Sequence, residues 1–224
     1  MAVLPVKGAP LPVILLIGFA PFDGHTSNPS WDAVRALDGV RVRGHRVVAR
    51  CLPVSFAGSS RALRGLLREL QPVLVVCVGQ AGGRAQLSLE RVAINVDDAR
   101  IADNDGACPV DEPVVAEGPA AYFSTLPIKA MLTALRDGGF PAEVSQSAGT
   151  YVCNHVFYDL LHALRRRRGV RAGFIHIPYS PAQAAAHPGA PSLPVETVTA
   201  ALKLALRVAV DTPRDTRIAA GAEH

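Results

Sequence analysis

The chain has 224 residues, of which 49% are hydrophobic and 19% are charged, and its formal net charge is +4 at pH 7. These values are typical of a globular protein with a sizeable core, and they exclude an intrinsically disordered chain. The apolar segment 11–19 is nine residues long, which suits a buried strand and is too short for a membrane span. Lys7 is the only charged residue that precedes this segment, and no small-residue cleavage site is evident, so we expect neither a signal peptide nor a membrane partner.

Strand-like and helix-like segments alternate along the chain. In chain order, the pattern predicts a strand over 13–19, a helix over 30–37, a strand over 47–54, a helix over 60–70, strands over 73–78 and 92–96, a helix over 128–136, a strand over 142–146, a helix over 154–167, a strand over 173–177 and a helix over 195–210. This alternation predicts a single three-layer α/β/α domain, residues 1–224, on a mostly parallel sheet. The ends, 1–11 and 212–224, are predicted to be loose.

Two long loops, 102–124 and 179–193, interrupt this pattern. Loops of that size are often lids or interface arms, although the Ala- and Pro-rich composition of 182–191 is equally typical of disorder. Asp103-Asn104-Asp105-Gly106 resembles the start of a calcium loop. It lacks the later ligands and the terminal Glu, so it predicts a turn and no metal site.

The basic run Arg165–Arg168 stands just before Gly169. Cations in the last turn of a helix offset the macrodipole, and glycine is common directly after a helix. No aromatic residues interleave with the arginines. We therefore interpret the run as a solvated helix end, and we expect no nucleic-acid partner.

The four cysteines, at positions 51, 77, 108 and 153, show no C-x-x-C spacing. Cys51 and Cys77 lie in apolar strand-like runs, which predicts that both are core residues. A reduced, cytoplasmic compartment is the simplest interpretation of this pattern.

Cys153 differs from the other cysteines because it lies between a strand and a helix, in Ser147-Ala148-Gly149-Thr150-Tyr151-Val152-Cys153-Asn154-His155. Free backbone N–H groups at a helix N-terminus favour a thiolate, which is the nucleophilic form of cysteine. Taken alone, the pattern fits a buried structural cysteine better, because free cysteine is among the most buried residue types.

Two other strand ends carry the partners that a nucleophilic thiol needs. His176 lies in an apolar run that ends at Pro178, and Glu90 opens the run 90–96 after the Gly-rich segment 79–84. An imidazole can take the thiol proton and later protonate the leaving amine, and a carboxylate can hold the imidazole in the required tautomer. Such groups are adjacent in the fold and not in the chain.

These segments resemble the pyroglutamyl peptidase I family, cysteine peptidases that remove an N-terminal pyroglutamyl residue. The resemblance runs from Gly18 to about Leu206 and rests on motifs in the same order: GFAPF at 18–22, NPSW at 28–31, GQAGGR at 79–84, ERVAIN at 90–95, DDARI at 97–101, GTYVCN at 149–154 and IHIPY at 175–179. It implies a catalytic triad of Cys153, His176 and Glu90, with Arg100 near the site as further support for the oxyanion. For Arg91 we favour a structural ion pair.

The family resemblance also implies a mixed sheet of phosphorylase/hydrolase-like topology, a homotetramer, N-terminally pyroglutamylated peptides as substrates, and no metal or cofactor. In this interpretation Gln80 in the Gly-rich loop binds the lactam ring. The nucleotide-binding alternative for that loop is weak, because both common phosphate-loop patterns are missing. The ring pocket is completed by a set of apolar and aromatic residues: Phe19, Phe22, Ile101, Tyr151 and Val152. Without the resemblance, core packing would be the better interpretation of Phe19 and Phe22.

Three positions depart from the family pattern. Ala20 and Ala182 stand where Glu is common, and Tyr151 replaces the usual Phe. None of them removes a catalytic group, although a buried Tyr151 hydroxyl needs a hydrogen-bond partner. Two other functions stay open at this stage: a cysteine amidohydrolase for another small acyl or lactam substrate, and a non-catalytic binding protein on the same scaffold.

Overall fold

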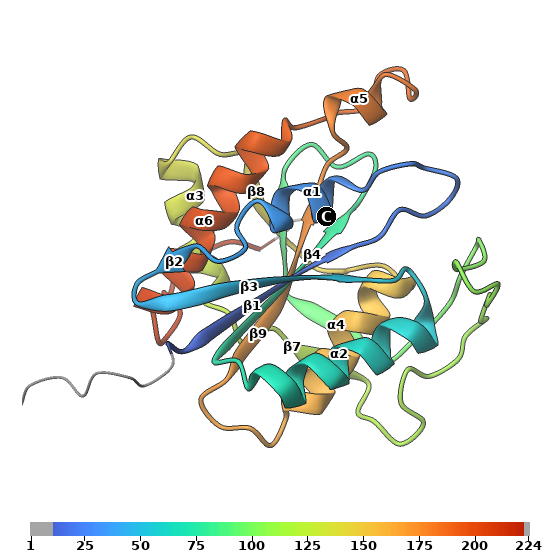
Figure 1. The fold of residues 1–224 in the computed structure, drawn as a ribbon, viewed down its shortest axis with the longest axis horizontal. Helices are drawn as coiled ribbons and strands as arrows, with labels where there is room; N and C mark the ends of the chain where they lie inside the picture. The colour runs from blue at the N-terminus through green and yellow to red at the C-terminus, as the bar shows by residue number, and fades with distance from the viewer. Residues whose placement is uncertain (1–10, 222–224) are drawn as a thin grey trace, which may run out of the picture.

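The computed structural model describes residues 11–221, which form a twisted central sheet with helices on both faces (Figure 1). The sheet has seven strands in the order β2-β3-β1-β4-β9-β5-β8. Their bounds are β1 Val13–Phe19, β2 Arg41–Val42, β3 His45–Leu52, β4 Leu74–Gln80, β5 Leu87–Glu90, β8 Ala142–Ser145 and β9 Arg171–Ile177. Strands β3, β1, β4 and β9 are mutually parallel, whereas β2 and β5 run antiparallel to β3 and β9. The predicted α/β class with a mostly parallel sheet is therefore confirmed.

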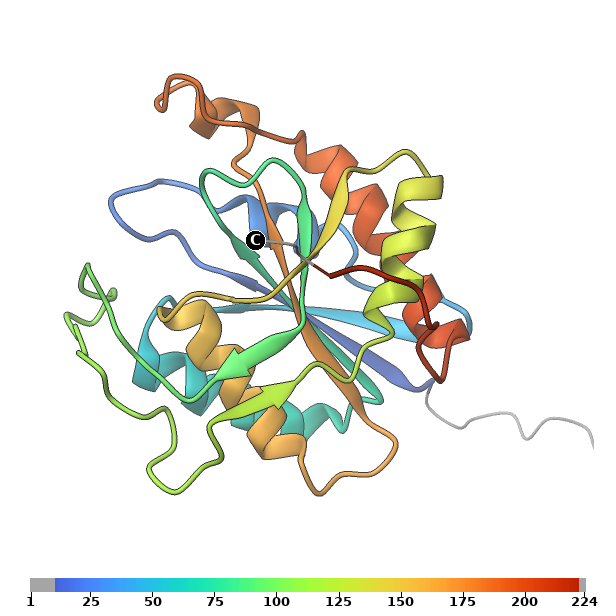
Figure 2. The ribbon, with the colours of Figure 1, turned by 180° about the vertical axis from the view of Figure 1, so that it is seen from behind.

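Two helical layers cover the sheet, as Figures 1 and 2 show from opposite sides. On one face lie α1 (Pro29–Arg35), α3 (Ile128–Asp137) and α6 (Val195–Asp211), and on the other lie α2 (Phe56–Leu70) and α4 (Val152–Leu164). A separate two-stranded ribbon, β6 (Val92–Ile94) with β7 (Ala121–Phe123), packs against α4. The short helix α5 (Pro181–Ala184) follows β9. Within residues 11–221, no helix combines the length and hydropathy needed to cross a bilayer.

Alternation along the strands decides which face each side chain occupies. Phe174 belongs to the core on the α2/α4 face, and Ile175 belongs to the core on the α1/α3/α6 face. Because successive strand residues point to opposite faces, His176 lies on the same face as Phe174. By the same argument Leu89 faces the α1/α3/α6 core, so Glu90 faces α4. The fold thus directs His176 and Glu90 toward the helix that begins next to Cys153.

All the predicted helices and strands are present, with limits shifted by a few residues. Sequence patterns missed the short strands β2, β5 and β7 and the single-turn helix α5. The predicted strand 92–96 is β6, which pairs with β7 outside the central sheet. Helix α4 ends at Leu164, and Arg165, Arg166 and Arg168 behind it are exposed, as a solvated helix end requires.

Cys77 is fully buried in β4, as predicted, but Cys51 is exposed, so the prediction of a core position was wrong for it. Cys51 stands near the end of β3, where Leu52 takes the core-facing position. Alternation places Cys51 on the face of Val47 and Ala49, which belong to the α1/α3/α6 core, but Cys51 itself lies outside that core near the strand end.

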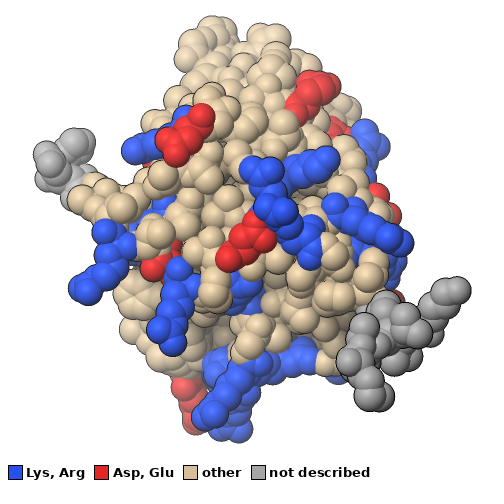
Figure 3. Space-filling model, turned by 90° about the vertical axis from the view of Figure 1, so that its left-hand side faces the viewer, with Lys and Arg blue, Asp and Glu red and all other residues tan. Residues whose placement is uncertain are grey.

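A second concentration of positive charge escaped the sequence analysis. Arg41, Arg43, Lys203 and Arg207 line a groove between β2 and α6. Figure 3 shows Lys and Arg side chains spread over the side of the molecule that carries β2, with acidic side chains among them. Arg43, one of the residues of this groove, forms a 2.8 Å ion pair with Asp211.

The described part of the C-terminal tail, 212–221, is held in place by α3. The Asp215 carboxylate accepts hydrogen bonds from the backbone N–H groups of Lys129 (3.1 Å) and Ala130 (2.9 Å), and the Ile218 carbonyl accepts one from the Lys129 ammonium (2.6 Å). The expected loose end is therefore wrong for these residues. Residues 1–10 and 222–224 lie outside the described part of the chain.

The loop 102–124 is organised around the buried carboxylate of Asp103. That group accepts hydrogen bonds from the backbone N–H groups of Phe56 (2.8 Å), Asp105 (2.9 Å) and Ala107 (2.8 Å). It therefore closes the turn and also caps the loop onto the start of α2. The contacts of Asp103 give the Asp-Asn-Asp-Gly segment a structural role.

We predict that Asp103→Ala lowers the free energy of unfolding by about 1–3 kcal/mol, because three backbone donors, of which that of Phe56 is buried, lose their acceptor. Urea denaturation followed by circular dichroism measures the change. Glu117→Ala, an exposed acidic position in the same loop, serves as the control and should unfold like the parent protein. Equal stabilities for the Asp103 and Glu117 variants would contradict the anchoring role.

Candidate active site

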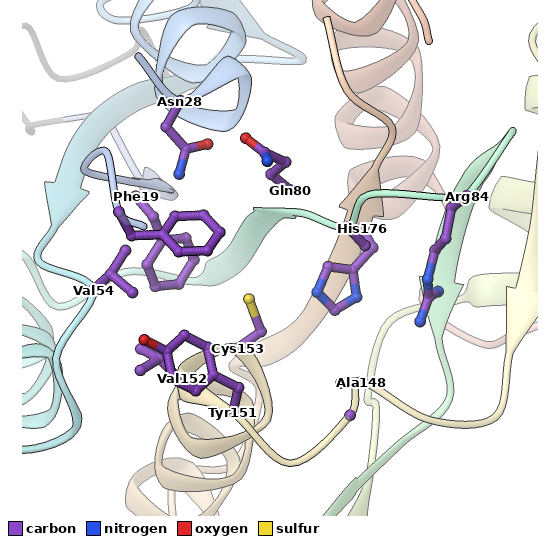
Figure 4. Close-up of a pocket in the computed structure, with 13 residues that line it drawn as sticks. Phe19, Asn28, Val54, Gln80, Arg84, Ala148, Tyr151, Val152, Cys153 and His176 are labelled. Atoms are coloured by element: carbon purple, nitrogen blue, oxygen red, sulfur yellow. The ribbon is translucent and has the colours of Figure 1, made fainter. Parts of the chain in front are cut away.

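A cavity of about 250 Å³ opens where β1, β4 and β9 end and α4 begins (Figure 4). The residues that line it come from these elements and the loops between them: Phe19, Phe22, Asn28, Val54, Gln80, Ala81, Arg84, Ala148, Gly149, Tyr151, Val152, Cys153 and His176. The carboxyl ends of parallel strands commonly form such sites in open α/β sheets. Cys153 and His176, which are remote in the chain, thus share one cavity.

Glu90 and His176 form a buried hydrogen bond. The Glu90 Oε1 atom lies 2.7 Å from His176 Nδ1, and the two residues are 0% and 3% exposed. The register explains the contact: Ser88 stands opposite His176 in the antiparallel pair of β5 and β9, so Glu90 is the diagonal neighbour on the same face. Glu90 lies at a strand end, as predicted, but it is the last residue of β5, a strand that the sequence patterns missed.

Arg84, in the Gly-rich loop, is the second partner of the Glu90 carboxylate. Its Nη1 atom donates to Glu90 Oε1 over 2.8 Å, and its Nη2 atom donates over 2.9 Å to the carbonyl of Ser147, in the loop that leads to Cys153. The second carboxylate oxygen, Glu90 Oε2, is buried without a hydrogen-bond partner among residues 11–221. Arg84 is the last residue of the GQAGGR segment at 79–84, but nothing in the sequence indicates that it contacts Glu90.

Cys153 lies in the first turn of α4, half-buried, and points its sulfur at β4. A Cβ atom placed on Gly79 would come within 2.8 Å of Cys153 Sγ and of the Phe174 ring. Gly79 is also the register partner of His176 in the parallel pair of β4 and β9. Because residue 79 is a glycine, there is space for the Cys153 sulfur against β4. The neighbouring strand, β9, carries His176 at the same level.

The start of α4 is fixed by Asn154. Its side-chain oxygen accepts a hydrogen bond from the Ile94 N–H (3.0 Å), and its amide nitrogen donates to the carbonyls of Ile94 (2.9 Å) and Val96 (3.0 Å). Gly149 has a φ of +77°, a conformation that glycine adopts without strain, in the turn before the helix. These contacts hold Cys153 at a defined position relative to β6.

Burial decides the protonation of the two reactive groups. It raises the pKa of Cys153 to about 12, with the charge of Glu90 acting in the same direction and Arg84 opposing it. Burial also lowers the pKa of His176 from 6.5, although the hydrogen bond and the charge of Glu90 oppose the shift. A neutral thiol next to a neutral imidazole is the result near pH 7. This differs from the thiolate that the helix N-terminus led us to expect, and desolvation of the sulfur is the largest cause of the raised pKa.

The pocket wall contains most of the predicted ring-binding residues. Phe19, Phe22, Tyr151 and Val152 line it, and Gln80 enters from the end of β4. Figure 4 shows Gln80 and Asn28 on one side of the cavity and Tyr151 and Cys153 on the other.

Two predicted site residues do not line the cavity. Arg100 and Ile101 are exposed and are not among the residues that line the cavity. The Tyr151 hydroxyl donates to the carbonyl of Ala102 over 3.1 Å, which supplies the partner that it needs. Arg91 donates to the carbonyl of Ala220 over 3.2 Å, in place of the expected ion pair.

Asn28 lines the cavity although the sequence analysis gave it no role. Its side-chain oxygen accepts from the Ser30 N–H as the N-cap of α1, and its amide donates to the carbonyl of Ala20. Asn followed by Pro is a helix-start signal that could have located it. Within residues 11–221, no three His, Cys, Asp or Glu side chains are arranged to hold a metal ion.

Known proteins resemble this chain over nearly its whole length. A family model described as pyroglutamyl peptidase matches residues 13–212. A pyrrolidone-carboxylate peptidase of Klebsiella pneumoniae is 59% identical over 211 residues, which span 94% of this chain and 99% of the relative. One from Cupriavidus taiwanensis is 58% identical over 216 residues, 96% and 100% of the two chains. The crystal structure of pyroglutamyl peptidase I from Bacillus amyloliquefaciens has a TM-score of 0.89 at 46% identity, covering 92% of this chain and 100% of that one.

We predict that Gly79→Ala displaces the Cys153 sulfur and slows its alkylation by iodoacetamide by about tenfold or more, because a 1 Å misplacement at a reacting atom can cost more than that. Mass spectrometry of the Cys153 peptide measures the rate. Gly65→Ala is the matched control, since a Cβ there meets nothing within 4 Å. It should leave alkylation unchanged and raise stability by about 0.5–1 kcal/mol. An unaltered alkylation rate in Gly79→Ala would contradict the packing described above.

Proposed function

The chain belongs to the pyroglutamyl peptidase family of cysteine-type hydrolases, and we propose that it removes an N-terminal pyroglutamyl residue from peptides through Cys153, His176 and Glu90. One observation carries the assignment of the residues. The Nδ1 atom of His176 is hydrogen-bonded to the buried Glu90 carboxylate, while Cys153 and His176 line the same cavity. This is the order of nucleophile, base and orienting acid that acyl transfer needs.

In the proposed reaction, the Cys153 sulfur attacks the carbonyl carbon of the pyroglutamyl residue. Because Glu90 engages Nδ1 of His176, Nε2 is the nitrogen left to accept the thiol proton. The imidazolium then gives this proton to the departing amine as the C–N bond breaks, which leaves a thioester on Cys153. Water adds to the thioester with the same imidazole as base, and the C–S bond breaks to release pyroglutamate and restore the thiol.

The raised pKa of Cys153 favours proton transfer during the attack over a stored thiolate. Glu90 supports that step, since its negative charge stabilises the imidazolium that forms. Arg84 holds Glu90 from the other side. Arg84 is therefore a positioning residue in this scheme, and Arg100 is given no role in it because it does not line the cavity.

The oxyanion of the tetrahedral intermediate is assigned to backbone N–H groups at the start of α4. The N–H groups of Val152 and Cys153 precede the first intrahelical hydrogen bond, which the His155 N–H donates to the Tyr151 carbonyl. Donors fixed in this way cost no reorganisation during the reaction, and the loss of one typically costs a factor of about 10²–10³ in rate.

The chemistry of the cavity favours a neutral lactam ring. Phe19 and Phe22 provide apolar walls, and Gln80 provides an uncharged amide. A pyroglutamyl ring carries an N–H and a C=O but no ammonium group. An ordinary N-terminal ammonium would be placed against apolar surface without a counter-charge, at a cost of several kcal/mol.

We extend the proposal to the setting in which the enzyme works. All four cysteines are free thiols, which suits a reducing, cytoplasmic compartment. The family resemblance favours a homotetramer, and the exposed Val110 and Phe123, at 69% and 68%, offer apolar contact surface for subunits. Sedimentation velocity tests the assembly, and a monomer at micromolar concentration would contradict it.

We predict that the purified protein releases a fluorophore from its pyroglutamyl amide, and that Cys153→Ser lowers kcat by a factor on the order of 10⁴ or more, because the hydroxyl is a far weaker nucleophile here. Cys51→Ser, an exposed thiol outside the cavity, is the matched control and should keep full activity. Iodoacetamide should inactivate the parent protein and the Cys51 variant alike. Full activity in Cys153→Ser would overturn the assignment of the nucleophile.

We predict an acidic limb of the kcat/KM profile below pH 6.5, because the pKa of His176 is lowered from that value and only its neutral form is a base. Glu90→Gln removes the charge that raises this pKa, so the limb should move further toward low pH while kcat falls by about 10²–10⁴. Initial rates over pH 4–9 with the fluorogenic amide, about the range in which an imidazole titrates, measure both effects. A limb that moves toward high pH in Glu90→Gln would contradict the proposed role of Glu90.

A further inference from the structure

Gln80 is the uncharged polar side chain that reaches the cavity from the end of β4. A glutamine amide offers an oxygen acceptor and two N–H donors, and its two orientations occupy nearly the same space. Which end faces the ligand therefore decides what the pocket recognises. The direction of the Gln80 amide can be deduced from its neighbours.

The neighbour of Gln80 is Gln183, which is 7% exposed and lies in α5. Two backbone groups fix the direction of the Gln183 amide. The Ser180 N–H donates to Gln183 Oε1 over 3.2 Å, and Gln183 Nε2 donates to the carbonyl of Ser27 over 3.4 Å. A reversed amide would place N–H against N–H and oxygen against oxygen. The capping box of α5, in which the Ser180 hydroxyl accepts from the Gln183 N–H, holds the same geometry.

With Gln183 fixed, the direction of Gln80 follows. Gln183 Nε2 donates its other hydrogen to Gln80 Oε1 over 2.9 Å. The acceptor of Gln80 is therefore occupied, and its Nε2 group has no acceptor among residues 11–221. Gln80 presents N–H donors to the cavity, which is the polarity that a ring carbonyl requires.

We propose that Gln183 is a positioning residue for substrate recognition, which holds the Gln80 amide so that it donates to the carbonyl of the lactam ring. The inference rests on the proposed function and adds to it the group that sets the polarity of the pocket. It also predicts discrimination against a prolyl residue, whose ring is of similar size but lacks the carbonyl and carries a charged amine. A donor facing that ring gains no partner, and no carboxylate lines the cavity to receive the ammonium.

The test uses ligand binding and not turnover. 2-Pyrrolidone, the lactam ring alone, should protect Cys153 of the parent protein from alkylation by iodoacetamide, and the concentration dependence of protection gives its dissociation constant. In Gln183→Glu the carboxylate offers only acceptors, so Gln80 must turn its N–H groups toward it and its oxygen toward the ligand carbonyl. We expect the dissociation constant to rise by about tenfold or more, since a buried acceptor then lacks a donor.

Two controls separate this role from a loss of structure. Alkylation without 2-pyrrolidone should proceed in Gln183→Glu within about twofold of the parent rate, because one rotated amide does not displace the sulfur. Gln71→Glu adds the same charge at an exposed position at the end of α2, and its dissociation constant should be unchanged. In a Gln80→Met background, Gln183→Glu should have no further effect, since residues that act through one contact are not additive.

Each outcome decides one claim. If 2-pyrrolidone protects the parent protein and Gln183→Glu equally, or if the two substitutions are additive, the role of Gln183 is refuted while the proposed function stands. A change of the unprotected alkylation rate together with the dissociation constant refutes it as well, because it indicates a merely structural residue. If 2-pyrrolidone does not protect the parent protein, the lactam pocket and this inference fail together.

Discussion

The site depends on the burial of one charged group, the carboxylate of Glu90. A carboxylate that is 0% exposed has lost the hydration of its charge, and this loss is tolerated only where hydrogen bonds and opposite charge replace it. His176 and Arg84 supply them, both at the same oxygen. Because Arg84 also bonds to the Ser147 carbonyl, the hydrogen bonds around Glu90 join β5, β9 and the loop before Cys153.

The same burial shapes the chemistry of the thiol. A fully charged sulfur–imidazole pair would have to be maintained beside Glu90 in a poorly hydrated cavity, and the raised pKa of Cys153 and lowered pKa of His176 express that cost. In the proposed reaction, charge then appears only when a substrate carbonyl is present to accept the sulfur. The tight fit between Gly79 and the sulfur fixes where this happens. A neutral resting pair also protects the thiol from electrophiles, since the thiolate is the reactive form.

The sequence allowed the prediction of the α/β layers, the helices and the groups at strand ends, because apolar periodicity and chain punctuation report local structure. Cys153, His176 and Glu90 could be named for the same reason, together with the family resemblance. Contacts between remote segments were out of reach. The antiparallel course of β5 depends on pairing with β9, and the link from Gln183 to Gln80 depends on how two loops meet. That Arg100 would be exposed and outside the cavity lining could not be predicted either, because its neighbourhood in the chain says nothing about the direction in which its loop turns.

The C-terminal tail has a consequence for how the chain tolerates shortening. Asp215 supplies the acceptors that the start of α3 otherwise lacks, since Pro127 provides no side-chain cap. Ala220 holds Arg91, the residue directly after Glu90 in the chain. A protein cut after α6 would keep every side chain of the cavity. It would lose the hydrogen bond between Ala220 and Arg91, which fixes the chain just after the end of β5. Loss of residues far from the cavity would in this way affect Glu90 and, through their hydrogen bond, His176.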